Sequence, residues 1–143
     1  MASVSTYLNF MGDTFEAFEF YRQVFGTEFR GPVLRNRDVP GMPDTMTESD
    51  LDSIMHIELP ILGGHVLMAT DMLETMGHEL RIGNNTTINL EPDTREETER
   101  LYALLSEGST EGAPLQDTFW GYWGSCLDRF GVRWMFNGPA KAE

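Results

Sequence analysis

The sequence is poor in positive charge. Lysine occurs once, at Lys141, and nine arginines supply the remaining basic charge against 23 acidic residues, which gives a formal net charge of −13. Nucleic acids and anionic membranes bind proteins through clustered positive charge, so both repel a chain this acidic. We therefore expect no nucleic acid and no membrane among its partners.

Cysteine and long apolar runs are also scarce. The one cysteine, Cys126, excludes a disulfide framework within the chain, is typical of a reducing compartment, and is expected to be buried and unreactive. No stretch reaches the ~18 consecutive apolar residues of a membrane span. The first ten residues, MASVSTYLNF, lack the basic segment and apolar run of a signal peptide. These absences lead us to expect a cytoplasmic protein.

The apolar residues that are present suffice for one folded domain. Of the 143 residues, 41% are hydrophobic and 23% are charged, whereas disordered chains have few hydrophobic residues. A chain of ~100–150 residues is usually one domain. We expect a single domain over 1–143, with a first module at about 4–71, a connector at about 72–83 and a second module at about 84–138.

An internal repeat divides this domain into two similar halves. Residues 7–14 (YLNFMGDT) align without gaps on residues 87–94 (TINLEPDT), and Asn9 thereby falls on Asn89. A repeat of this kind indicates that one supersecondary unit has been duplicated. Because a single copy is too small to bury both its helix and its sheet, we expect the two copies to share a core.

Both halves have the order strand, turn, helix and then further strands. Asp13 and Asp93 are each followed by Glu three residues later, the spacing of a capping box, so helices are expected to begin near both. Residues 36–53, which hold two prolines and five acids, are expected to form a long surface loop or lid. The later strands are expected at 28–35, 54–61 and 65–71 in the first half, and at 114–120, 122–127 and 132–137 in the second.

Tandem β-α-β-β-β modules resemble the vicinal oxygen chelate superfamily, which contains glyoxalases, bleomycin-resistance proteins and ring-cleaving dioxygenases. The sequence is most similar to the PhnB-like branch. The resemblance implies an α+β fold whose two modules form a curved, mixed, mostly antiparallel sheet around a cavity. The matching motifs are YLNF (7–10), EAFEFYRQVFG (16–26), MHIEL (55–59), GG-x-x-LMATD (63–71), LQDTFWG (115–121) and DRFGVRWMFN (128–137).

The resemblance also bears on metal binding. Metal-using members of the superfamily place two ligands in each module, one in the first strand and one in the last. These positions correspond here to Thr6 and Thr86, and to positions near Met68 and Met135. A divalent ion prefers imidazole nitrogen or carboxylate oxygen, which threonine and methionine do not supply. We therefore expect no metal at the usual site and no other cofactor.

Two polar residues lie two positions apart in a predicted strand. His56 and Glu58 should point to one face, while Met55, Ile57 and Leu59 point to the other and suit packing under a helix. Four interpretations are open: cavity-lining ligand-binding residues, a general base with its orienting carboxylate, two ligands of a relocated metal site, or a polar pair on a half-exposed strand.

An aromatic cluster, LQDTFWGYW, lies at 115–123. Aromatic side chains with a few polar groups are typical of a small-molecule cavity, and equally of a core or a subunit interface. The resemblance implies a homodimer at this chain length, with the aromatic segment or the 36–53 loop as candidate contacts. The candidate ligand-binding residues are His56, Glu58, Met68, Gln116, Phe119, Trp120, Trp123 and Met135.

Three classes of function remain. The first is a binding module that holds a small organic molecule without metal, as bleomycin-resistance relatives do by sequestration. The second is a lyase, isomerase or dioxygenase-type enzyme that uses His56 and Glu58 as catalytic residues, with or without a divalent ion. The third is a structural or regulatory subunit. The absent metal ligands favour the first class over the second, and the content of Trp, Phe and Met favours both over the third.

Overall fold

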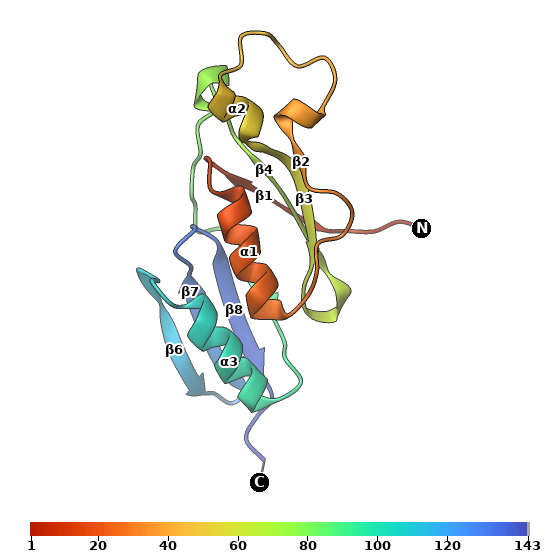
Figure 1. The fold of residues 1–143 in the computed structure, drawn as a ribbon. Coiled ribbons are helices and arrows are strands. Elements are labelled where there is room, and N and C mark those ends of the chain that lie inside the picture. Colours follow the sequence, from red (N-terminus) through yellow and green to blue (C-terminus); the bar gives the residue numbers. More distant parts are fainter. Residues whose placement is uncertain (143) are drawn as a thin grey trace. The chain divides into compact units, whose positions relative to one another are not determined.

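The computed structural model describes residues 1–142 and has an α+β fold built from two tandem β-α-β-β-β modules (Figure 1). The chain divides into two compact units, the first ending at Arg81 and the second beginning at Ile82. This boundary falls within the connector expected at about 72–83. Each unit carries its own four-stranded mixed sheet, so the two are described separately.

The first unit has the strand order β1-β4-β3-β2. β1 runs parallel to β4, and the other neighbouring strands are antiparallel. Its main elements are β1 (Thr6–Phe10), α1 (Thr14–Phe25), β2 (Leu34–Arg35), β3 (Ile54–Pro60) and β4 (Val66–Asp71). Four short helical segments join or follow them: η1 (Asn36–Asp38), α2 (Glu48–Asp52), η2 (Leu62–Gly64) and η3 (Glu74–Met76).

One face of this sheet is covered by α1 (Figure 1). The helix buries Phe18 and Tyr21 completely, against strand residues such as Ile57 and Leu59 that are also inaccessible to solvent. It ends at Gly26, which takes the left-handed conformation (φ 65°) that glycine adopts without steric cost. Most side chains on the other face of the sheet are partly or fully exposed.

The second unit repeats this architecture, with the strand order β5-β8-β7-β6. β5 is parallel to β8, and α3 packs on β7 and β8. The core contains Leu101 and Leu105 from the helix and Trp134 and Phe136 from β8, all of them inaccessible to solvent. The elements are β5 (Ile88–Leu90), α3 (Arg95–Leu105), β6 (Glu111–Asp117), β7 (Tyr122–Leu127) and β8 (Arg133–Gly138).

The two predicted helix starts are confirmed, but the predicted capping boxes are wrong. The side chain of Asp13 makes no capping hydrogen bond to α1. The cap comes instead from Asp71 at the end of β4, whose Oδ1 accepts from the backbone N–H groups of Gly12 and Thr14 at 3.0 and 3.1 Å. In the second unit the cap is Thr94 rather than Asp93, because the Thr94 hydroxyl accepts from the backbone N–H of Glu97.

Three predicted segments differ from the structure. Only Leu34–Arg35 of the run at 28–35 is a strand, because Gly31 has a positive φ (71°) and Pro32 lacks the N–H that a ladder needs. The strand expected at 114–120 is β6, which begins earlier and ends at Asp117. The 36–53 loop contains the short helical segments η1 and α2.

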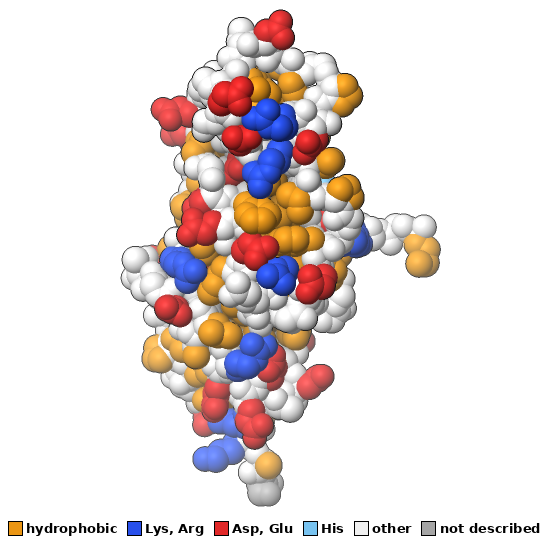
Figure 2. All heavy atoms as spheres, viewed as in Figure 1, with side chains coloured by type: hydrophobic (Ala, Val, Ile, Leu, Met, Phe, Trp, Pro, Cys, Tyr) orange, Lys and Arg blue, Asp and Glu red, His pale blue; other side chains and the backbone are white. Residues whose placement is uncertain are grey.

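Acidic and basic side chains are interspersed on the surface around α1, as Figure 2 shows. Arg22 pairs with Glu19 at 3.0 Å, and Arg37 pairs with Asp52 at 2.6 Å. Within residues 1–142, no helix combines the length and the apolar character needed to cross a membrane.

Candidate functional site

The first sheet has an open face, made by the side chains of β1, β3 and β4 that point away from α1. We call it the first open face. Tyr7 lies opposite Met68 across β1 and β4, and Met68 lies opposite Glu58 across β4 and β3, so the three form one row. The members of the first open face are Tyr7, Asn9, His56, Glu58, Met68 and Thr70.

His56 and Glu58 lie on the same face, as predicted from their spacing. The Nε2 of His56 is 2.7 Å from Oε2 of Glu58, and the two side chains are 27% and 21% exposed. Ile57 and Leu59 are buried on the opposite side, as expected. Met55 was expected there too but is half-exposed, because β3 is irregular where it pairs with β2, and Ile54 is buried instead.

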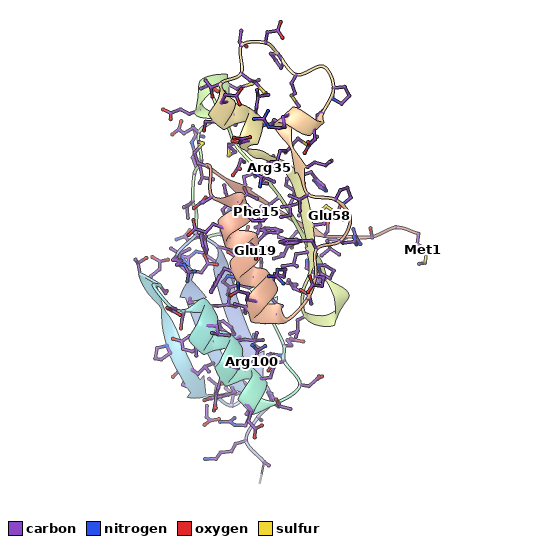
Figure 3. The ribbon with its side chains drawn as sticks, viewed as in Figure 1. Met1, Phe15, Glu19, Arg35, Glu58 and Arg100 are labelled. Atoms are coloured by element: carbon purple, nitrogen blue, oxygen red, sulfur yellow. The ribbon has the colours of Figure 1, made fainter. Side chains whose placement is uncertain are left out.

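Arg30 completes the surroundings of the Glu58 carboxylate and was missed from the sequence. Its Nε donates to Oε1 of Glu58 at 2.7 Å, and its backbone N–H donates to the carbonyl of Glu58 at 2.9 Å. Hydrogen bonds from His56 and Arg30 hold the pKa of Glu58 below its ordinary value, so the carboxylate is ionised at neutral pH. Glu58 is labelled on the edge of the first unit in Figure 3.

Tyr7 approaches the other nitrogen of the imidazole. Its hydroxyl oxygen is 3.4 Å from Nδ1 of His56, and the two ring centroids are 5.9 Å apart. Burial raises the pKa of Tyr7, an effect opposed in part by a hydrogen bond from Thr70. The motif YLNF marked this strand as a family feature but gave no sign that Tyr7 meets His56, because the contact joins strands 49 residues apart.

The contacts of His56 with Glu58 and Tyr7 determine which ring nitrogen carries the hydrogen. An ionised Glu58 next to Nε2 favours the tautomer in which Nε2 carries the hydrogen. In the neutral ring the lone pair then lies on Nδ1, on the side of Tyr7. A histidine oriented by a carboxylate is suited both to accepting a hydrogen bond from a ligand and to abstracting a proton from one.

The second sheet also has an open face, made by the side chains that point away from α3, which we call the second open face. Gln116, Trp123 and Asn137 lie opposite one another on β6, β7 and β8. Ser125, Met135 and Asn89 form the neighbouring row on β7, β8 and β5. The predicted residues Gln116, Trp123 and Met135 are thus brought onto one face.

Two asparagines that the sequence did not single out as ligand-binding residues connect this face to Trp120. The indole N–H of Trp120 donates to Oδ1 of Asn137 at 3.0 Å, and Nδ2 of Asn137 donates to Oδ1 of Asn89 at 2.6 Å. Trp120 also packs edge-on against Trp123, with ring centroids 6.5 Å apart. The second open face therefore combines indole surface with oriented amide groups.

Phe119 differs from the other aromatic candidates. It lies with Trp120 in the turn between β6 and β7, where the Thr118 N–H and the Gly121 carbonyl close the turn at 2.9 Å. Phe119 is 97% exposed and Trp120 is 54% exposed, so neither belongs to the core. Exposed aromatic side chains of this size are typical of a surface that another molecule covers.

The superfamily's metal positions need a correction in register. Thr6 lies opposite Leu67, a core residue, so Thr6 is on the helix side of the sheet. The open-face residues of the two first strands are Tyr7 and Asn9 in β1 and Asn89 in β5, which lie opposite Met68, Thr70 and Met135. Thr86 precedes β5.

The corrected donor set does not fit a divalent ion. The phenol, amide, hydroxyl and thioether groups at these positions lack the imidazole and carboxylate donors that such an ion prefers. Among residues 1–142, no three or more His, Cys, Asp or Glu side chains gather where they could hold a metal ion.

Comparison with known proteins agrees with this architecture. No protein-family model matches the chain. The crystal structure of protein PA1353 from Pseudomonas aeruginosa is 34% identical with a TM-score of 0.84, and the match covers 99% of this chain and 100% of that one. Protein YjdN of Escherichia coli strain K12 is 26% identical over 142 residues, which cover 94% of this chain and 93% of YjdN.

Two further solved structures are similar to this chain in fold and have names that identify the kind of protein. A PhnB protein from Bacillus cereus is 22% identical with a TM-score of 0.73, over 96% of this chain and 99% of that one. A glyoxylase/bleomycin resistance protein/dioxygenase domain from Frankia sp. is 14% identical with a TM-score of 0.63, over 97% and 98%. The chain therefore has the fold of glyoxalase/bleomycin resistance/dioxygenase, or vicinal oxygen chelate, proteins, and a PhnB protein is among the solved structures that share it.

Proposed function

We propose that this protein binds a small organic molecule at its open sheet faces and does so without a divalent metal. The observation that carries the proposal is the hydrogen-bonded row on the first open face, in which Arg30, Glu58, His56 and Tyr7 orient one another. Small-molecule sites combine a few oriented polar groups with apolar surface. Here Met68 lies between Tyr7 and Glu58 and supplies the apolar surface.

The second open face supports the same proposal with different chemistry. Trp120 and Trp123 offer indole surface, and Asn89 and Asn137 offer amide groups already fixed by hydrogen bonds. An aromatic surface with a few placed hydrogen-bonding groups suits a ring-containing or partly apolar ligand.

An enzymatic role is the alternative, and one observation favours it. The 2.7 Å contact between His56 and Glu58 is the arrangement of a general base and its orienting carboxylate. A lyase, isomerase or dioxygenase-type reaction would use His56 to move a proton, with or without a divalent ion. We place binding first because the superfamily's metal positions hold no imidazole or carboxylate side chain.

Ligand-observed NMR tests the binding proposal. The probes are a panel of neutral, acidic and basic aromatic compounds, each titrated against the purified protein. We expect part of the panel to bind. Binding at the first open face should be lost when His56→Ala and Glu58→Ala are combined, and binding at the second open face should be lost in Trp123→Ala. Arg100→Ala, which removes an exposed ion pair with Glu97 on α3, is the matched control. Binding of no compound, or binding that all of these variants retain, contradicts the proposal.

A further inference from the structure

Resting on the proposed function, we infer that the first open face recognises a neutral hydroxyl group, that of a phenol or an alcohol, which bridges the Tyr7 hydroxyl and Nδ1 of His56 from the solvent side. The ligand oxygen accepts from Tyr7 and the ligand hydrogen is donated to His56. The chemical class of the ligand follows from these two groups and not from the fold.

The acceptor half of this site is set by Glu58. Its Oε2 lies 2.7 Å from Nε2 of His56 and so keeps the ring hydrogen on that nitrogen. Its other oxygen is held by Nε of Arg30 at 2.7 Å, which stops the carboxylate from rotating toward solvent. In this tautomer the imidazole has one acceptor, Nδ1, which lies on the side of Tyr7.

The donor half is the Tyr7 hydroxyl. Its 3.4 Å distance from Nδ1 is long for a hydrogen bond from a hydroxyl, which usually spans about 2.7–2.8 Å to an oxygen acceptor. A weak internal contact of this kind is easily replaced by two shorter bonds to an entering group. Tyr7 is 49% exposed, so a ligand can reach its hydroxyl.

The charge around the site selects among ligand groups. Residues 1–81 hold 13 acidic residues and five arginines, which disfavours the approach of an anion. An ammonium group has donors but no acceptor, so it cannot satisfy the Tyr7 hydroxyl as a donor. A neutral hydroxyl both donates and accepts, and it matches both halves of the site.

The test compares three probes that share one ring system. 2-Naphthol donates and accepts, 2-methoxynaphthalene only accepts, and 2-naphthoate carries a negative charge. Dissociation constants are measured at neutral pH by ligand-observed NMR for the wild type, Tyr7→Phe and His56→Ala. Tyr122→Phe is the matched control, because it removes a tyrosine hydroxyl that bonds Glu99 of α3 in the second unit, on the helix side of that sheet.

We expect 2-naphthol to bind about fivefold more tightly than 2-methoxynaphthalene, the ratio that one net neutral hydrogen bond gives. We expect 2-naphthoate to bind more weakly than either. The preference for the hydroxyl should vanish in Tyr7→Phe and His56→Ala and persist in Tyr122→Phe, with thermal melting confirming that each variant is folded.

Some results would contradict the hydroxyl site and leave the proposed small-molecule binding in place. Equal affinities for 2-naphthol and 2-methoxynaphthalene, or a preference that survives in Tyr7→Phe, overturn the hydroxyl inference while small-molecule binding stands. Tighter binding of 2-naphthoate also overturns it and indicates an anion site. If none of the three binds, the inference is overturned, and the broader compound panel alone decides whether the protein binds small molecules.

Discussion

Glu58 is the residue that organises the first open face, because each of its carboxylate oxygens has a partner. One oxygen accepts from Arg30 and the other meets His56, both at 2.7 Å. The charge of Glu58 is thereby balanced at the sheet surface, and the ring of His56 is fixed. Loss of this carboxylate should loosen both neighbours at once.

Replacing Glu58 by Gln should lower stability in a way that depends on pH. The pKa of Glu58 is held below its ordinary value of 4.5 by hydrogen bonds from His56 and Arg30. A lowered pKa contributes stability above the unfolded-state pKa, and this contribution is lost as pH falls through the folded-state pKa. Denaturant unfolding should show a deficit in Glu58→Gln at pH 7 that shrinks below about pH 4.5.

The control for this series is Glu79→Gln. Glu79 is 73% exposed and pairs with Arg81 at 3.5 Å, so its charge should contribute little at any pH. A Glu58→Gln deficit that stays constant from pH 7 to well below pH 4.5 would show that the carboxylate charge does not stabilise the fold.

Cys126 should be unreactive in the native protein. It is 3% exposed, and burial raises the pKa of its thiol to about 12. Since the thiolate is the reactive form, a thiol reagent at neutral pH should modify native protein at least about a hundredfold more slowly than denaturant-unfolded protein. The reaction is followed by absorbance, and the unfolded chain with its single thiol is the internal control. Equal rates would place Cys126 at the surface.

The sequence predicts contacts between residues that are close along the chain, but it does not predict contacts between residues that only the folded sheet brings together. The shared face of His56 and Glu58 follows from the two-residue period of a strand. Tyr7 and Arg30 reach the same cluster from β1 and from an irregular segment before β2, and no local pattern encodes either contact. Burial of Cys126 was expected because free cysteine is among the most often buried residue types, and in the structure it lies between half-exposed neighbours in β7.

At the level of elements, the two helices begin at equivalent places but are capped by different means. Helix α3 has a local cap, the Thr94 hydroxyl, which accepts from Glu97 at 3.0 Å. Helix α1 depends on Asp71, 57 residues away from Thr14 in sequence. The capping-box pattern at Asp13 therefore predicted the right boundary through the wrong side chain, since only the folded sheet brings Asp71 to the helix.

Asp71→Ala should cost more stability than Thr94→Ala. The buried Asp71 carboxylate accepts from Gly12, from Thr14 twice and from Ile54, all within 3.1 Å. Its removal leaves buried donors without an acceptor, so we expect a loss of about 3 kcal/mol. Loss of the exposed Thr94 cap should cost about 1 kcal/mol. Denaturant unfolding of both variants measures the difference, and equal losses would show that Asp71 does not cap α1.

At the level of the whole molecule, the two units have the same arrangement of strands and helix because one module was duplicated, but the side chains on their open faces differ. The repeat predicted two modules correctly because the hydrophobic periods of its strands and helix are local features. The open faces of the modules differ in chemistry: His56 and Glu58 occur only in the first unit, and the Trp120 and Trp123 pair only in the second. A repeat alignment cannot predict such differences, because they lie on the open faces and not among the core positions that are similar in each copy.

A homodimer remains our prediction for the assembly. The exposed side chains of Phe119 and Trp120 pack edge-on, with ring centroids 4.8 Å apart. Their apolar surface is in contact with solvent in the single chain, and a second chain could bury it. Light scattering at micromolar concentration should give about twice the 16.2 kDa of one chain. In Phe119→Ala combined with Trp120→Ala the mass should fall toward that of one chain, with Phe15→Ala as the control from another exposed aromatic position. A wild-type mass of one chain contradicts the prediction.

The purified protein should hold no divalent metal ion, because of the donor groups on its open faces. The open-face positions nearest to the superfamily's ligands hold Tyr7, Asn9, Met68, Thr70, Asn89 and Met135, none of which offers an imidazole or a carboxylate. The acidic surface attracts cations diffusely, but diffuse charge is not a coordination site.

Elemental analysis of purified, dialysed protein should therefore find well under one divalent metal ion per chain. A rebuilt site would have to use His56 and Glu58, whose two donors fall short of the three or four protein ligands of a stable zinc site. Added zinc or nickel should accordingly leave the thermal melting temperature unchanged, in the wild type and in the double variant His56→Ala with Glu58→Ala alike. One zinc, nickel or iron per chain that survives dialysis and disappears in the double variant would overturn the metal-free proposal. It would also place the enzymatic alternative first, because a metal beside an oriented histidine supplies the chemistry that a bare binding face lacks.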